Sequence, residues 1–265
     1  MPQILTEQDG HVLTVTINRP ARRNSLTTSN LSRLADIWHE AADDNSVRVV
    51  VLTGADGSFC TGMDLRDLAG DTDDEDAAAV TERTKTDPGF AYRALLKTDR
   101  MNKPIVAAVE GNAIAGGLEL LLGTDIRVAG ESARFGLSEV RWALYPAGGG
   151  VVRLSRQIPS TVAADLMLTG RHIDAAEARQ LGLIGQVVPD GRALETARQI
   201  AASIAANGPL AVEAVVRTLR HTEAMSEEEA FAFEQPQIAS IFGSDDAKEG
   251  PRAFAEKRTP VFHGR

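Results

Sequence analysis

Apolar residues in the first half of the chain recur in patterns that predict strands. Residues 4–17 read as a hairpin that turns at Asp9-Gly10 and then alternates toward a core. Two uninterrupted apolar runs, at 47–52 and 105–109, are typical of strands buried on both faces, and 125–129 predicts a further strand.

Helical spacing of apolar residues appears between and after these strands. A helix is expected to begin near residues 27–29, and 116–122 predicts a short apolar helix that follows a turn at 110–115. A solvated acidic loop at 71–76 is expected to lead into a long exposed helix within 70–101. Strands early and helices late indicate an α/β fold with a helical C-terminal extension. The late helices are expected at 162–168, 175–181, 192–206 and 209–221.

Composition restricts the function classes that fit this fold. The 265 residues suit one large domain or a domain with an appendage, and 28 Lys+Arg against 37 Asp+Glu give a net charge of −9. This charge disfavours nucleic-acid binding. The single cysteine, Cys60, excludes an internal disulfide. Neither a signal peptide nor a membrane span is expected from the sequence. A soluble cytoplasmic protein without a membrane partner is therefore predicted.

Two glycine turns, at 57–64 and 111–117, each follow a predicted buried strand and lead into a predicted helix. Backbone N–H groups at such a helix start favour an anion or a developing oxyanion. Neither turn is a GxGxxG or Walker loop, and spacing alone also fits ordinary tight α/β connections.

Glu119 is an acidic residue in an otherwise apolar helical turn, where burial of its carboxylate is costly unless it is paired, protonated or functional. A structural salt bridge or a surface position is the alternative for Glu119. Glu139 taken alone also fits a surface or helix-capping glutamate. No GxSxG, HExxH or similar spacing occurs, so neither a nucleophilic serine nor a metal or redox cofactor is predicted.

Ten short motifs in chain order resemble the enoyl-CoA hydratase/isomerase family, the crotonase superfamily. This resemblance implies a spiral of ββα units over residues 1–200 and a helical region over 201–265 that makes trimer contacts and part of the coenzyme A site. A homotrimer or a dimer of trimers is expected. The motifs are NRP at 18–20, with an asparagine at 24, FCTGMDL at 59–65, KPIVAAVEG at 103–111, AGGLEL at 115–120, DIR at 125–127, FGLSE at 135–139, PAGGG at 146–150, LTG at 168–170, AAEA at 175–178 and FAEKR at 254–258.

The resemblance also implies an acyl-CoA thioester substrate, with no separate cofactor because coenzyme A is part of that substrate. The family's two oxyanion-hole amides fall on Met63 and Gly116, and its two catalytic carboxylates fall on Glu119 and Glu139. The Met63 side chain is expected to shape the acyl slot. Residues 70–101 cover a segment that lines the acyl pocket in this family. Further substrate or coenzyme A contacts are expected at Arg22, Asp64, Leu65, Gly117, Phe254 and Lys257, the last two from a neighbouring subunit.

Arg22, Arg23 and Lys257 fit solvated surface charges equally well, and Ala21 stands where the family often has lysine. The two glutamates favour a 2-enoyl-CoA hydratase that adds water reversibly across the 2,3 double bond through an oxyanion-stabilised enolate, in the breakdown of fatty acids or related acyl-CoAs. An enoyl-CoA isomerase or a specialised dehydratase of the carnitinyl-CoA type is the alternative. A non-catalytic acyl-CoA-binding scaffold, including an RNA-binding one, belongs to a different class.

Overall fold

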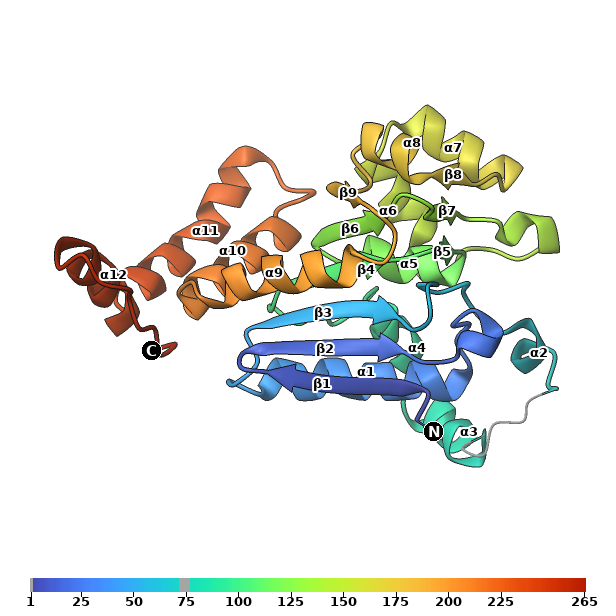
Figure 1. Ribbon diagram of the computed structural model, residues 1–265, viewed down its shortest axis with the longest axis horizontal. Helices are drawn as coiled ribbons and strands as arrows, with labels where there is room; N and C mark the ends of the chain where they lie inside the picture. Colours follow the sequence, from blue (N-terminus) through green and yellow to red (C-terminus); the bar gives the residue numbers. More distant parts are fainter. Residues whose placement is uncertain (1, 72–76) are drawn as a thin grey trace.

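The computed structural model describes residues 2–71 and 77–265, and its centre is a six-stranded sheet in the order β1-β2-β3-β4-β6-β9 (Figure 1). β1 and β2 form the predicted hairpin, antiparallel, whereas every other neighbouring pair in this sheet is parallel. A smaller sheet has the order β5-β7-β8. The strands are β1 (Ile4–Asp9), β2 (Val12–Ile17), β3 (Val49–Gly54), β4 (Ile105–Val109), β5 (Asn112–Ile114), β6 (Ile126–Gly130), β7 (Arg134–Gly136), β8 (Ile173–Asp174) and β9 (Gln186–Val188).

At the central strands β3 and β4 both faces of the large sheet are buried, which explains why these strands read as continuous apolar runs. Alternate residues of each strand point to opposite sides. Val49 and Val51 join one core cluster with helix α9 (Ala193–Ala205), whose alanines recur on one side. Val50 and Leu52 join the other, larger cluster. The small alanine side chains let α9 lie close against the sheet.

The larger cluster packs around helices α1 (Thr28–Asp43) and α5 (Gly116–Leu122). α1 begins where the sequence predicted. The Thr27 hydroxyl accepts a hydrogen bond from the Asn30 amide, and the Asn30 Oδ1 accepts one from the Thr27 amide. Every residue of α5 is buried. The other elements of this region are η1 (Pro20–Arg22), α2 (Leu65–Leu68), α3 (Ala77–Thr86), α4 (Phe90–Ala94), η2 (Glu139–Trp142), α6 (Gly150–Gln157), α7 (Ser160–Thr169) and α8 (Ala175–Gln180).

The last three helices, α10 (Pro209–His221), α11 (Glu227–Phe242) and α12 (Asp245–Ala255), extend away from the sheets (Figure 1). The Arg220 guanidinium ties α10 to the core by bonding both oxygens of Asp125, at 2.6 and 2.8 Å. The expected boundary at residue 200 falls inside α9, which still packs on the sheet.

Three expectations about local structure need correction or lie outside the described residues. The turn expected at 110–115 contains strand β5, which pairs with β7. The long exposed helix expected within 70–101 is instead two helices, α3 and α4, separated at 87–89. Most of the acidic cluster, residues 72–76, lies outside the described residues.

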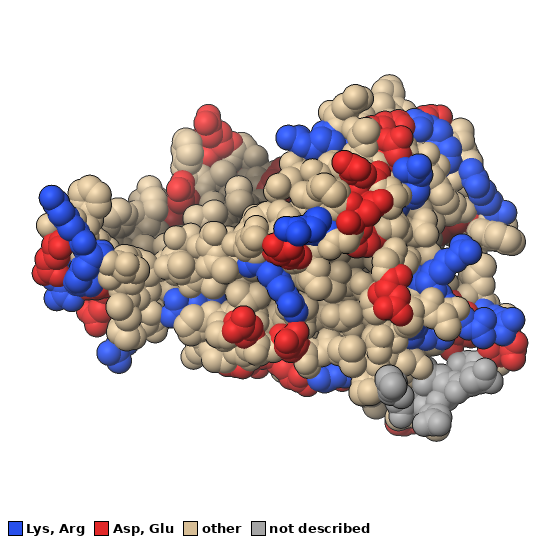
Figure 2. All heavy atoms as spheres, viewed as in Figure 1, with Lys and Arg blue, Asp and Glu red and all other residues tan. Residues whose placement is uncertain are grey.

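Charged side chains of both signs are interspersed over the face shown in Figure 2. Among the described residues no single helix is long and apolar enough to cross a membrane, although α9 and α10, bent by 111°, reach that length and composition together.

Candidate active site

Met63 lies between two backbone bonds that fix which way its own amide points. The Leu26 amide donates to the Gly62 carbonyl, and the Asp64 amide donates to the Leu26 carbonyl, both at 2.8 Å. In this parallel pairing the N–H of the middle residue faces away from the partner strand. A methyl group added at Gly116 would lie 3.6 Å from the Met63 nitrogen. The Met63 amide therefore lies beside the start of α5.

The Gly116 amide is the first N–H of α5, and helix geometry gives it no partner within the helix. Ala115, directly before it, has φ 51° and ψ −127°, a strained conformation for a residue with a side chain. Gly62 has φ 88°, and a methyl group there would lie 2.8 Å from the Gly116 nitrogen. In the described part of the chain neither the Met63 nor the Gly116 amide donates a hydrogen bond to the protein. Both are free to bind an oxyanion.

Glu119 lies one turn further along α5 and is only 4% exposed. Its Oε1 accepts a hydrogen bond from the Gly150 amide at 2.8 Å, and the Gly148 amide donates to the same carboxylate. Methyl groups added at Gly148 and Gly150 would lie 2.7 and 3.0 Å from the carboxylate oxygens. The loop 146–150 thus needs glycine because its backbone closes directly on Glu119.

Opposing effects act on the pKa of Glu119. Burial raises it, while the Gly150 and Gly148 amides lower it, and the positive charges of Lys97 and Arg153 lower it further. The net direction is upward from the ordinary value. The amides and the two cations all favour the ionised carboxylate at this position.

Glu139, the first residue of η2, is 9% exposed, so the surface position considered from sequence is wrong. Neither of its carboxylate oxygens has a hydrogen-bond partner among the described residues. Burial raises the pKa of Glu139 to about 7, and the nearby Glu119 charge adds to this effect. Glu139 is therefore the carboxyl group of the pair that holds a proton more readily.

The two glutamates differ in protonation preference beside a pair of free amides. Carboxyl groups whose environments separate their pKa values divide the roles of acid and base between them. The arrangement at Met63, Gly116, Glu119 and Glu139 is suited to stabilising a developing oxyanion while one carboxylate removes a proton and the other supplies one.

Two of the expected substrate contacts make structural contacts within the chain. The Asp64 carboxylate pairs with the Arg19 guanidinium at 3.0 Å and caps α2 by accepting from the Arg66 amide. Gly117 is buried, and a methyl group there would lie 2.1 Å from the Cys60 carbonyl oxygen, so close packing explains this glycine.

The remaining expected contacts fall in two distant places. Arg22 in η1 and Leu65 at the start of α2 are exposed. Phe254, 87% exposed, and Lys257 belong to the α12 region, which lies at the opposite end of the molecule from α2 (Figure 1). Within one chain these two residues are not brought together with Met63 and Gly116.

Several residues that shape the site were not assigned a role from the sequence. Buried Asn24, at φ 56°, accepts from the Arg19 amide and donates to the Ala55 and Ser58 carbonyls, which holds the turn after β3. The triple glycine at 148–150 is visible in the sequence, but the sequence does not show that this loop packs on Glu119. Lys97 and Arg153 gave no local signal at all.

The described residues contain no group of three His, Cys, Asp or Glu side chains placed to hold a metal ion. The Cys60 thiol is fully buried, and burial raises its pKa to about 12. It therefore serves as packing beneath the two amides rather than as a nucleophile.

The fold and the site together define a class of protein that binds a developing oxyanion beside an acid and a base. The chain belongs to the enoyl-CoA hydratase/isomerase family, whose model matches residues 7–265. This confirms the family predicted from the motifs.

Individual relatives cover the whole chain. Enoyl-CoA hydratase EchA19 of Mycobacterium tuberculosis (strain ATCC 25618 / H37Rv) is 53% identical over 100% of this chain and 97% of that protein. The 2,3-dehydroadipyl-CoA hydratase of Escherichia coli (strain K12) is 37% identical over 100% of both. The crystal structure of an enoyl-CoA hydratase from M. tuberculosis H37Rv matches with a TM-score of 0.89, 38% identity and full coverage of both chains. The predicted mixed α/β fold with C-terminal helices is confirmed.

Proposed function

We propose that this protein is an enoyl-CoA hydratase that adds water reversibly across the 2,3 double bond of a 2-enoyl-CoA thioester. The observation that carries the proposal is the pair of buried glutamates with opposite surroundings, next to the free amides of Met63 and Gly116. The hydratase names of the relatives above support the same reaction. No separate cofactor is proposed, since coenzyme A belongs to the substrate, and the cytoplasm is the proposed location.

The proposed reaction has two proton transfers. The thioester oxygen accepts hydrogen bonds from the Met63 and Gly116 amides. The Glu119 carboxylate removes a proton from water as the water oxygen bonds to C3, and the electron pair of the double bond moves to form an enolate. Glu139 then gives its proton to C2, which restores the thioester carbonyl. Each preorganised amide contributes about 3 kcal/mol to stabilising the enolate.

Coenzyme A is proposed to enter beside η1, where the exposed Arg22 and Arg23 face its phosphates. Leu65, 46% exposed, lines the approach to the thioester next to Met63. The distance of α12 from this entrance within one chain supports a contribution of Phe254 and Lys257 from a neighbouring subunit.

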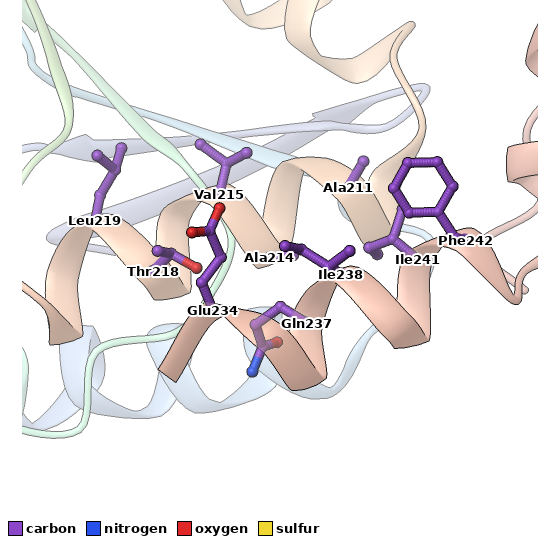
Figure 3. Close-up of a pocket in the computed structure, with 10 residues that line it drawn as sticks. All are labelled: Ala211, Ala214, Val215, Thr218, Leu219, Glu234, Gln237, Ile238, Ile241 and Phe242. Atoms are coloured by element: carbon purple, nitrogen blue, oxygen red, sulfur yellow. The ribbon is translucent and has the colours of Figure 1, made fainter. Parts of the chain in front are cut away.

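A homotrimer or a dimer of trimers is the proposed assembly. An open apolar groove lies between α10 and α11, lined by residues such as Val215, Leu219 and Phe242 (Figure 3). These three side chains are 58, 69 and 78% exposed, which is costly for a monomer in water. Light scattering at micromolar concentration checks this assembly, and a stable monomer would contradict it.

The decisive experiment follows loss of the ultraviolet band of the conjugated enoyl thioester with crotonyl-CoA and longer 2-enoyl-CoAs. Glu119→Gln and Glu139→Gln should each slow hydration by about 10²- to 10⁴-fold, because each removes one proton-transfer group. Glu131→Gln, at an exposed glutamate outside the site, is the matched control and should keep full activity. Activity retained in either site variant would refute the assignment.

Substrates of other reactions separate the alternatives. Turnover of 3-enoyl-CoAs without hydration of any 2-enoyl-CoA would make the protein an isomerase. Turnover of a specialised 3-hydroxyacyl-CoA alone would make it a dehydratase. Acyl-CoA binding without any turnover would identify a scaffold.

A further inference from the structure

Lys97, which belongs neither to the glutamate pair nor to the two amides, is an exposed residue that bonds to the loop around Glu119. Its Nζ donates a hydrogen bond to the Ala147 carbonyl at 2.7 Å. A methyl group added at Gly149 would lie 3.6 Å from Lys97 Cγ and 3.8 Å from its Cδ. Lys97 therefore lies against Ala147 and Gly149. These two residues alternate along the loop with Gly148 and Gly150, whose amides bind Glu119.

The position of the Lys97 ammonium is fixed from a second side. Nζ lies 4.3 Å from the centre of the Tyr92 ring, a cation–π contact. The Lys97 amide also donates to the Tyr92 carbonyl at 2.8 Å. Leu96, at φ 55°, supplies the left-handed turn that brings the chain back after α4. Because Lys97 is anchored to α4, its bond to Ala147 connects two separate segments.

Three charged groups interact with Glu119 from the elements packed around it. Lys97 follows α4, Arg153 belongs to α6 and Glu139 begins η2. The Arg153 guanidinium is already bonded to the Leu95 and Leu96 carbonyls. The two cations favour an ionised Glu119, while Glu139 opposes it once it loses its proton.

We propose that Lys97 is a positioning residue for the hydration reaction. Lys97 donates a hydrogen bond to the Ala147 carbonyl and lies beside Gly149, and these contacts hold the loop in place. The Gly148 and Gly150 amides of that loop then orient the Glu119 carboxylate toward the attacking water. The positive charge of Lys97 also favours the ionised form of that carboxylate. This inference rests on the proposed function, because the orientation of Glu119 matters only if Glu119 acts as the base.

Two variants at Lys97 test this role by separating the charged donor from the packing of the stem. Lys97→Met keeps an apolar stem on Gly149 but loses the donor and the charge, whereas Lys97→Arg keeps both. Lys97→Met should lower kcat about tenfold with KM for crotonyl-CoA changed less than about twofold, and it should move the acid limb of the pH profile to higher pH. Lys97→Arg should restore most of the activity and return the acid limb toward its wild-type position.

Arg192→Met is the control, because Arg192 is an exposed cation directly before α9, outside residues 70–101, and it pairs with Glu195 at 2.9 Å. It should leave kcat and the pH profile unchanged. The proposal is overturned if Lys97→Met behaves like this control, if only its KM rises, or if kcat falls while the acid limb stays in place.

An infrared measurement separates failure of this inference from failure of the proposed function. The band of a protonated carboxyl group that disappears in Glu119→Gln reports the titration of Glu119 without any turnover. In Lys97→Met this band should persist to higher pH than in the wild type, and an unchanged titration overturns the role of Lys97. If the wild type hydrates no 2-enoyl-CoA, the proposed function fails whatever the band shows.

Discussion

The surroundings of Glu119 and Glu139 differ although both side chains are buried glutamates of one site. Glu119 projects from a regular helix, α5, toward a loop that supplies the Gly150 amide at 2.8 Å. Glu139 starts a short 3-10 turn, and neither of its oxygens has a hydrogen-bond partner in the described part of the chain. Two cations, Lys97 and Arg153, favour the charged form of Glu119.

This comparison shows that burial alone does not assign acid and base. Burial raises the pKa of both glutamates, so it does not distinguish them. Hydrogen-bond donors and nearby cations act on Glu119 and favour its ionised form. Glu139 has no such side-chain or loop donor, and its carboxyl group stays neutral to a higher pH. The loop around Glu119, rather than the depth of either residue, creates the division of roles.

The largest effect is expected when the loop is forced away from Glu119. In Gly148→Ala the new methyl group would lie 2.7 Å from the Glu119 Oε2 and 2.6 Å from the Leu95 Cδ1, so the carboxylate must move. Hydration of crotonyl-CoA should slow by about 10²- to 10⁴-fold, the range for loss of a general base. Steady-state kinetics measure this loss.

Gly185→Ala is the matched control for that substitution. Gly185 is exposed, and a methyl group there meets only the Arg127 carbonyl oxygen, at an ordinary 3.4 Å. The control should keep the wild-type rate and melting temperature. A Gly148→Ala protein that hydrates at the wild-type rate would show that the glycine loop does not position the base.

The sequence predicts the long elements of this fold well because their apolar patterns are complete. β4 and α5 occupy the ranges predicted for them, since an unbroken apolar run followed by glycines has few other structures available. β5 and β7 have three residues each, too few for a pattern, and so 110–115 was expected to be only a turn. The break between α3 and α4 is different, because it falls at Asp87-Pro88-Gly89, a local helix-breaking sequence that the expectation of one long helix overlooked.

The same contrast applies to the site. Met63, Gly116, Glu119 and Glu139 are all found from motifs, because each lies in a short local pattern. What separates the two glutamates is a contact between residues 31 positions apart, the Gly150 amide and Glu119. No local pattern encodes that contact.

The pH dependence of activity tests the protonated member of the pair. Glu139 supplies a proton only in its protonated form, and its pKa is raised to about 7, mainly by burial. In the free enzyme kcat/KM should therefore fall about tenfold for each pH unit above 7. Rates at several pH values with crotonyl-CoA measure this limb. A profile that stays flat to about pH 9 would remove Glu139 from the acid role.

A smaller effect is expected on stability. A pKa raised from 4.5 to about 7 in the folded state means that Glu139 contributes stability below pH 4.5, which is lost as the pH rises toward 7. Glu139→Gln stays neutral throughout and escapes this loss. Between pH 5.5 and 8 the variant should gain about 2 kcal/mol relative to the wild type. Denaturant unfolding at both pH values, at one protein concentration, measures the difference, and an equal stability offset at both would contradict it.

The smallest effect concerns a third carboxylate, Asp64, which pairs with Arg19 at 3.0 Å. Burial opposes its ionisation, but the hydrogen bonds and charge of Arg19, with the Arg66 amide, hold the pKa of Asp64 below its ordinary value. Its charge therefore contributes stability above pH 3.8 that is lost as the pH falls through the lowered folded-state pKa. Asp64→Asn should cost about 1 kcal/mol at pH 7 and progressively less in acid, as denaturant unfolding would measure.

Activity of the same variant distinguishes the structural role of Asp64 from direct substrate binding. If Asp64 only holds the Arg19 loop and caps α2, KM for crotonyl-CoA should stay within about twofold of the wild-type value. A several-fold rise in KM without loss of stability would instead make Asp64 the substrate contact that the family resemblance implies. The contrast with the two glutamates is one of partners. The Asp64 carboxylate is paired with a guanidinium, which keeps it charged and holds its loop in place. Neither Glu119 nor Glu139 has a cationic partner at hydrogen-bond distance among the described residues.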